Sequence, residues 1–237
     1  MRADTTAAPP PSPVACYEAP LHPLLMTLLY VVFKQAWSPS QCWVENTKTG
    51  SGIKGGILML KGKNVRLRPI RRSDISYFLK WFNDPEVVQY LEMYLPMTEM
   101  SEEKFIEELG TTRARSDLIL VIEVIEGAST KPIGNCGLHE IDPKDHRARF
   151  GIVIGEKDYW GKGYGTEAAR LIIDYGFQQL NLHRISSGAF AFNERSIRLQ
   201  KKVGFREEGC LRQSFFKNGQ YHDLVQFGIL GKEWRGL

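Results

Sequence analysis

The amino-acid sequence predicts a mixed α/β domain built on a largely antiparallel sheet. Apolar residues make up 43% of the 237 residues, enough for a packed core. Segments with the period of a strand and segments with the period of a helix follow one another in the irregular order β-α-α-β-β-β-α-β-α-β-β. This order favours a mixed sheet over a doubly wound parallel one. The formal net charge of +4 is too small to suggest the neutralisation of nucleic acid.

The first 58 residues differ in composition from the rest of the chain. They hold seven of the twelve prolines but only seven charged side chains. The apolar run at residues 21–33 is shorter than the roughly 20 residues that a bilayer span needs. We therefore expect residues 1–58 to be an N-terminal extension, poorly ordered or translated from upstream sequence, and residues 59–237 to form the functional domain. Residues 54–56 can be encoded by a purine-rich ribosome-binding site, which makes Met59 the expected start.

The cysteines indicate a reducing compartment. The four residues lie far apart, without a CxxC pair or a Cys/His spacing typical of metal ligands. A zinc site and a disulfide framework are therefore not expected, and the cytoplasm is the expected location. The cysteines are Cys16, Cys42, Cys136 and Cys210.

The first part of the domain shows one strand followed by two helices. Residues 64–70 alternate between polar and apolar and predict a strand. Asp74 caps a helix whose apolar residues follow the i, i+3, i+4, i+7 spacing, and Pro85 follows its end. Ser101 is the expected N-cap of the second helix, with Glu102 and Glu103 placed near its positive end. The buried side of that helix is expected at Phe105, Ile106 and Leu109.

The later part alternates strands and helices and closes with a hairpin. Residues 118–125 form an aliphatic run, as expected of a strand covered on both faces. Asn218-Gly219 is a hairpin turn signal, and Gly204 ends a helix. The expected elements are strands at 118–125, 132–141 and 147–155, a helix at 166–180, a strand at 184–192, a helix at 193–203, and hairpin strands at 205–216 and 221–230.

A glycine-rich turn precedes the helix at 166–180. Gly161, Gly163 and Gly165 leave backbone N–H groups uncovered at a helix N-terminus, where amides and the helix dipole bind phosphate. Lys162 adds a positive charge. The spacing fits neither a Walker P-loop nor the dinucleotide fingerprint. A turn with a purely structural role stays open as the alternative.

Two segments resemble the GNAT N-acetyltransferase superfamily, in particular its RimJ/RimL-like branch. Residues 151–169, with Trp-Gly-Lys-Gly-Tyr-Gly at 160–165, resemble its motif A, and residues 193–205 resemble motif B. The resemblance covers about residues 59–234. It implies an α+β, GNAT-like acyl-CoA N-acyltransferase fold, with about seven strands flanked by helices and a splay between two central parallel strands. It also implies acetyl-CoA as co-substrate and no metal.

The resemblance implies a cofactor site along the splayed strand, the glycine-rich turn and motif B. Main-chain groups of Ile152, Val153 and Ile154 would pair with the pantetheine arm. Asn193 would hydrogen-bond the pantetheine, and Ser196 would lie beside it. Lys201, together with Arg198 and Lys202, would meet the nucleotide phosphates, although a solvated helix face explains this basic run equally well. The pyrophosphate would be held by the amides of Gly161, Lys162, Gly163, Tyr164, Gly165 and Thr166.

The expected reaction is direct attack of a neutral amine on the thioester carbonyl, polarised by a backbone N–H. Two departures from the family bear on it. Arg149 stands where many relatives have Glu, and Gln200 stands where many have a tyrosine acid. Glutamine has no titratable proton, so no general acid is assigned. His139 and Glu140 are the alternative base candidates, and because they are adjacent on a strand only one of them is expected to face the cleft.

The sequence therefore predicts an acetyl-CoA-dependent N-acetyltransferase acting on a primary amine. A protein N-terminal α-amine is the first expected acceptor, and a polyamine or aminoglycoside amine is the alternative. A CoA-binding regulatory module with weak or no turnover is the alternative of another class, favoured if Arg149 and Gln200 disable the chemistry. Neither nucleic acid nor membrane is an expected partner, and the sequence is compatible with a homodimer.

Overall fold

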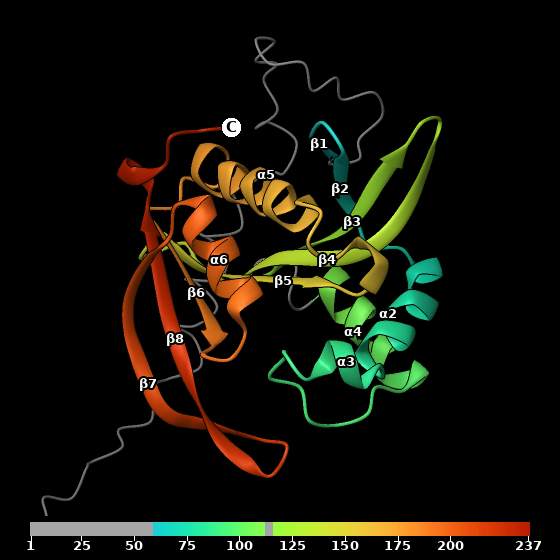
Figure 1. Cartoon of the computed structure of the whole chain (residues 1–237). Helices are drawn as coiled ribbons and strands as arrows, with labels where there is room; N and C mark the ends of the chain where they lie inside the picture. The colour runs from blue at the N-terminus through green and yellow to red at the C-terminus, as the bar shows by residue number, and fades with distance from the viewer. Residues whose placement is uncertain (1–58, 112–115) are drawn as a thin grey trace, which may run out of the picture. The chain divides into compact units, whose positions relative to one another are not determined.

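The computed structural model describes residues 59–111 and 116–237, so the expectation for residues 1–58 lies outside the described residues (Figure 1). Eight strands form one sheet in the order β1-β2-β3-β4-β5-β6-β8-β7. Every neighbouring pair is antiparallel except β5 and β6, which confirms the predicted mixed sheet. The strands are β1 (Leu60–Lys61), β2 (Val65–Pro69), β3 (Leu118–Glu126), β4 (Ser129–Asp142), β5 (Arg147–Ile154), β6 (Arg184–Phe190), β7 (Arg206–Lys217) and β8 (Gln220–Leu230).

Helices cover both faces of this sheet. Helices α5 and α6 lie on one side of the central strands, and α2, α3 and α4 lie on the other (Figure 1). The pleat of β3 shows the two layers directly, because Leu120 and Ile122 belong to the main core while Val121 packs against α2. The helices are η1 (Arg72–Asp74), α2 (Ile75–Phe82), α3 (Pro85–Val88), α4 (Glu99–Gly110), η2 (Lys157–Tyr159), α5 (Tyr164–Gln178), α6 (Glu194–Val203) and η3 (Gly231–Glu233).

The start of α4 differs from the prediction. Thr98, not Ser101, is its N-cap, and its side chain accepts a hydrogen bond from the Ser101 amide. The Ser101 hydroxyl oxygen in turn accepts a hydrogen bond from the Thr98 amide, which completes a capping box. The prediction was wrong because both residues are good caps, and a hydroxyl at N3 serves the helix as well as one at the cap. With Thr98 as the cap, Glu102 is the fourth residue of α4 and its side chain is buried.

A buried ion cluster attaches α2 to the sheet. The Arg68 guanidinium on β2 is 3% exposed and binds Asp74 through two hydrogen bonds of 2.7 and 2.8 Å. Its Nε donates to Glu123 on β3 at 2.7 Å. These carboxylates raise the pKa of Arg68 well above its ordinary value, so the arginine is always charged. Because each charge in the cluster is paired and hydrogen-bonded, removal of one partner leaves another charge buried without compensation.

The parallel strands β5 and β6 separate after a short pairing. They pair from Arg147 opposite Arg184 to Arg149 opposite Ser186, and β5 then continues to Ile154 without β6. Gly155 follows the end of β5, where an added Cβ would lie only 2.0 Å from Trp81 on α2. The close approach of Trp81 holds the end of β5 against α2. The predicted splay between two central parallel strands is therefore confirmed.

Candidate functional site

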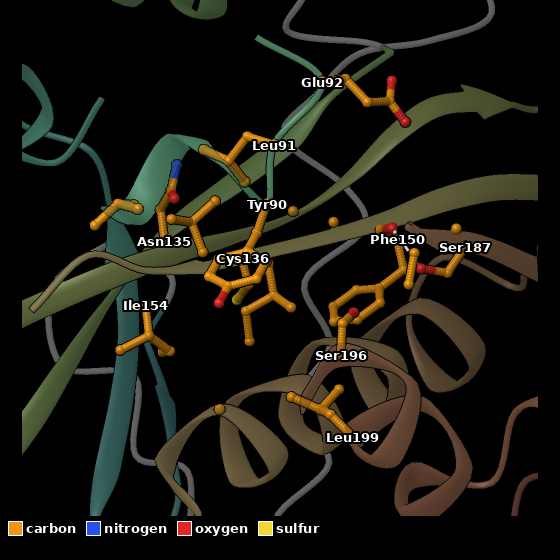
Figure 2. A pocket seen from close by; sticks show the side chains of 18 of the residues that line it. Tyr90, Leu91, Glu92, Asn135, Cys136, Phe150, Ile154, Ser187, Ser196 and Leu199 are labelled. Atoms are coloured by element: carbon orange, nitrogen blue, oxygen red, sulfur yellow. Dashed lines mark hydrogen bonds between the residues drawn. The ribbon is translucent and has the colours of Figure 1, made fainter. Parts of the chain in front are cut away.

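A cavity of about 1410 Å³ occupies the splay. Figure 2 shows that Ile154 lies toward one end of it, while Phe150 and Ser187 lie together toward the other. Two groups of residues line this cavity. One group comes from β5, β6, α6 and the glycine-rich turn, and the other comes from β4, α4 and the segment after α3. The first is here called the carrier half and the second the acceptor half.

The glycine-rich turn presents unused N–H groups to the carrier half. Gly161 and Gly163 have φ values of 73° and 91°, which favour glycine, and Gly163 is the N-cap of α5. The first amides that bond inside the protein are those of Thr166 and Glu167, both to the Gly163 carbonyl. Among the described residues, no acceptor binds the amides of residues 161–165. The turn therefore combines five free donors with a helix N-terminus, which suits a phosphate group.

The Thr166 amide and the Lys162 side chain of this turn depart from the expected roles. The Thr166 amide is bonded to Gly163 at 3.0 Å, so it is not available to a diphosphate. The Lys162 ammonium lies 5.6 Å from the Tyr159 ring, and the Tyr164 ring packs at 5.8 Å from the same ring. Neither Lys162 nor Tyr164 lines the cavity with its side chain. These two residues contribute main-chain donors only.

The open edge of β5 forms one wall of the carrier half. Residues at even positions direct their main-chain groups toward β6, as shown by the Ala148 and Phe150 carbonyls, which accept hydrogen bonds from side chains on β6. By alternation, the main-chain groups of Ile152 and Ile154 face the same side, whereas those of Val153 face β4, as does the Gly155 amide, which donates to the Ile133 carbonyl at 2.9 Å. The Ile154 carbonyl accepts a hydrogen bond from the Trp160 indole at 2.6 Å. An added extended chain can therefore pair with Ile152 and the Ile154 amide but not with Val153.

Helix α6 closes the carrier half. Its N-cap is Asn193, whose Oδ1 accepts a hydrogen bond from the Ser196 amide at 3.1 Å. Both residues line the cavity. The Asn193 side chain therefore fixes the helix end, and its amide group is left for a ligand because it has no partner among the described residues. Asn193 and Ser196 thus both lie at the cavity, and their contacts with the pantetheine stay a prediction.

Lys201 of α6, which was expected at the cofactor phosphates, lies elsewhere. Lys201 does not line the cavity, and its ammonium lies 3.1 Å from Glu207 on β7. Arg198 and Lys202, which were expected with it, do line the cavity, as does Arg195, which was not expected. Arg195 and Lys202 are about two turns apart and share a helix face, from which Lys201 lies about 100° away. The Arg195 guanidinium lies 4.8 Å from the Trp160 ring. Sequence proximity alone did not distinguish these faces.

In the acceptor half, both base candidates line the cavity. An added Cβ at Gly137 would lie 2.9 Å from His139 Nε2, and one at Gly151 would lie 3.3 Å away. The imidazole thus occupies space that two glycines on neighbouring strands leave open. The expectation that only one candidate faces the cleft was wrong, because a bulge interrupts β4 at this point. Glu140 has a φ of 52°, so the side-chain alternation fails there.

Glu102 is a feature of this half that the sequence analysis missed. Its side chain is 1% exposed, and Oε2 has no hydrogen-bond partner in the described part of the chain. Burial raises the pKa of this carboxyl group. The signal was present in the sequence, since Glu102 stands three, four and seven residues before Phe105, Ile106 and Leu109 and therefore shares their helix face.

One ion pair and two hydrogen bonds hold the segment after α3, which covers the acceptor half. Arg149 on β5 binds Glu92 at 2.5 Å, so a carboxylate from another element accompanies the arginine at this position. The Lys217 ammonium on β7 donates to the carbonyls of Leu91 and Met93. Burial lowers the pKa of Lys217. The segment after α3 is thus tied to both the centre and the far edge of the sheet.

Comparison with known proteins identifies the family. The family model described as "Acetyltransferase (GNAT) domain" matches residues 64–206, which is more than half of the chain. The chain belongs to the GNAT acetyltransferase family. It is 33% identical over 180 residues to spermidine N(1)-acetyltransferase of Escherichia coli K12, with 74% of this chain and 91% of that protein covered. It is 39% identical over 103 residues to the putative ribosomal N-acetyltransferase YdaF of Bacillus subtilis, with 44% and 56% covered.

A solved structure shares the fold. The spermidine N-acetyltransferase from Vibrio cholerae in complex with CoA and spermine has a TM-score of 0.66 and 27% identity, covering 72% of this chain and 97% of that one. The GNAT-like fold predicted from motifs A and B is therefore confirmed. The comparisons do not test the individual site residues, which stay predictions.

Two further observations concern the described part of this GNAT chain. No group of three or more His, Cys, Asp or Glu side chains there is placed to hold a metal ion. None of the helices in residues 59–111 and 116–237 has the length and apolar character needed to cross a membrane.

Proposed function

We propose that this GNAT domain, residues 59–237, transfers an acetyl group from acetyl-CoA to a primary amine. One observation carries the proposal. Free amides at a helix N-terminus, three of them from the cavity-lining Gly161, Gly163 and Gly165, meet the open edge of β5 in a single cavity, and carboxylates line its other half. The first two features suit a diphosphate joined to an extended amide-containing arm, and the third suits a cationic acceptor.

The residues present fit the carrier. The free amides of the turn, with Arg195 and Lys202 nearby, would hold the diphosphate. Ile152 and the Ile154 amide would pair with the arm as an added strand does. The four residue steps from Ile154 to Phe150 span about 13 Å, so the arm would bring its thioester toward the apex of the splay. Bound there, acetyl-CoA supplies the activated acyl group.

His139 is the proposed base. The acceptor amine must be neutral to attack, and at pH 7 its deprotonation costs about 1.4 kcal/mol for a protein α-amine and about 4.6 kcal/mol for an alkyl amine. An imidazole accepts a proton in this pH range. The His139 ring lies against Gly151 at the splay, where the two halves of the cavity meet. Glu140, exposed and in the bulge, is the alternative.

The proposed acceptor is a small amine with a second cationic group. Glu92, Glu102 and Glu140 line the acceptor half, and Asp117, whose Oδ1 accepts a hydrogen bond from the Glu140 amide, lines the cavity beside them. The cationic side chain at these carboxylates, among the described lining residues, is Arg149 of β5, which pairs with Glu92. Glu102 is buried with an unpartnered oxygen, and an ammonium group would compensate it. The similarity to spermidine acetyltransferases over 91% of their length supports this choice.

A protein N-terminal α-amine, the first expectation from the sequence, is the second candidate. The 39% identity to a putative ribosomal N-acetyltransferase favours it, as does the smaller free energy needed to deprotonate an α-amine. This similarity spans 56% of that protein, so the polyamine type of acceptor is placed first.

Thiol release from acetyl-CoA, measured over a panel of amines, tests the proposal. We expect release with di- and polyamines, smaller release with N-terminal peptides, and a gain of one acetyl group on the acceptor by mass spectrometry. A preference for N-terminal peptides would instead make a protein α-amine the first candidate acceptor and a polyamine the second. Binding of acetyl-CoA without thiol release for every amine would instead support the CoA-binding regulatory module.

A further inference from the structure

A chain of three polar groups stands at the apex of the splay. Gln200 on α6 donates from Nε2 to the Ser187 hydroxyl on β6 at 2.6 Å. That hydroxyl donates to the Phe150 carbonyl on β5 at 3.1 Å. Both side chains are buried, with Gln200 2% and Ser187 8% exposed. The other polar atom of the glutamine, Oε1, is buried and without a partner in the described residues, and Gln200 lines the cavity.

The direction of these hydrogen bonds is set by the backbone. A carbonyl oxygen only accepts, so the single proton of the Ser187 hydroxyl is directed at Phe150. The hydroxyl oxygen then accepts from Gln200, which requires the glutamine amide nitrogen on that side. In the opposite orientation the hydroxyl would turn to Oε1, leaving the Phe150 carbonyl and both N–H groups of the glutamine without partners. The observed orientation leaves fewer buried groups unsatisfied, so Oε1 is the atom of this cavity-lining residue that has no partner among the described residues.

The apex is where the reactive end of the carrier arrives. The glycine-rich turn lies near Ile154, because an added Cβ at Gly165 would lie 3.5 Å from the Ile154 side chain. Phe150 and Ser187 lie at the other end of the cavity from Ile154 (Figure 2). An arm extended along β5 from that turn therefore ends beside Gln200. Its sulfur is an acceptor in the thioester and a donor in the free thiol, because only the thiol carries an S–H.

We infer that Gln200 receives the S–H of free CoA and that this contact makes the site prefer free CoA to acetyl-CoA. The inference rests on the proposed function. In the reaction the amine nitrogen forms the C–N bond, the C–S bond breaks, and the electron pair of that bond goes to sulfur. The proton on the attacking nitrogen then passes to sulfur, directly or through water, and gives the thiol. Gln200 has no proton to give in this orientation, so it acts after transfer, as a product-binding residue with Ser187 as its positioning residue.

Binding measurements test this without turnover. Titration calorimetry of the wild-type chain compares CoA, acetyl-CoA and S-methyl-CoA, the last being a thioether without S–H. At about pH 7, where a thiol is protonated, we expect CoA to bind about three- to tenfold more tightly than either S-substituted compound. The preference should shrink at about pH 9.5, where an ordinary thiol is ionised and the glutamine oxygen faces a negative charge.

Variants separate this role from a structural one. Gln200→Leu should make the three affinities equal, and Ser187→Ala, which frees the amide to turn, should reduce the difference. Gln226→Leu is the matched control, because this exposed glutamine on β8 does not line the cavity. Equal binding of CoA and S-methyl-CoA to the wild-type chain would overturn the inference even if no variant folds. The same holds for a preference that Gln200→Leu leaves unchanged. Failure of all three compounds to bind would overturn the proposed function itself.

Discussion

Replacement of Glu102 by glutamine should stabilise the protein at neutral pH. The glutamine keeps the size of the side chain and removes the charge that is buried without a partner. A buried unsatisfied group of this kind costs about 1–3 kcal/mol, and we expect Glu102→Gln to raise the free energy of unfolding by about that amount at about pH 8. The matched control is Glu103→Gln, which changes an exposed neighbour and should leave the free energy unchanged.

The pH dependence gives the sign of this effect. Because burial raises the pKa of Glu102, the folded state holds this proton more tightly than the unfolded state. The wild type therefore loses stability as pH rises from about 4.3, the ordinary pKa of glutamate, through the higher folded pKa. At about pH 4 both states are largely protonated, and the difference between Glu102→Gln and the wild type should nearly vanish.

Urea unfolding followed by circular dichroism at the two pH values measures this difference. A variant that is less stable than the wild type at the higher pH would refute the reasoning. A gain that is equal at both pH values would refute it as well, because it would not come from the charge. In assays, the same variant should raise KM for polyamines while leaving the affinity for acetyl-CoA unchanged, since Glu102 lies in the acceptor half.

Three further predictions follow from close contacts. At Gly163 an added Cβ has space, but the φ of 91° strains any residue other than glycine by about 1–3 kcal/mol. Gly163→Ala should therefore displace the turn and weaken CoA binding about tenfold in calorimetry, and an unchanged affinity would contradict this. Gly155→Ala would place a Cβ 2.0 Å from Trp81 and should lower the free energy of unfolding by about 1–3 kcal/mol, whereas a neutral result would show that the ring moves aside. Asp74→Ala leaves Arg68 partly unpaired and should lower that free energy by about 3–5 kcal/mol, measured by denaturant titration; a loss below about 1 kcal/mol would mean that water reaches the cluster.

Local patterns in the sequence predicted much of the secondary structure around the carrier half of the site. The glycine-rich turn predicted the start of a helix, and Asn193 and Gly204 predicted the two ends of α6. Each of these depends on a few neighbouring residues, so a single chain segment contains the whole argument. The prediction weakened where one segment offered two equal choices, as with Ser101, which turned out to be the third residue of α4 and not its cap.

The acceptor half depends on neighbours that the sequence does not reveal. Periodicity showed which face of α4 is buried but gave no reason to expect a carboxylate there without a partner. The bulge that brings His139 and Glu140 to one cavity arises from the pairing of β4 with β5, which no local pattern specifies. Likewise, the pairing of Lys201 with Glu207 depends on where β7 passes α6.

The sequence by itself determined the order of the main strands and helices, the two ends of α6 and the presence of a glycine-rich turn before α5, because each follows from short-range backbone geometry. The tertiary structure alone decided which carboxylates meet in the acceptor half and which atom of Gln200 is left without a partner among the described residues. Both depend on hydrogen bonds between strands and helices that are distant in the chain, and the direction of such bonds is fixed only when the carbonyl of Phe150 and the hydroxyl of Ser187 are brought together.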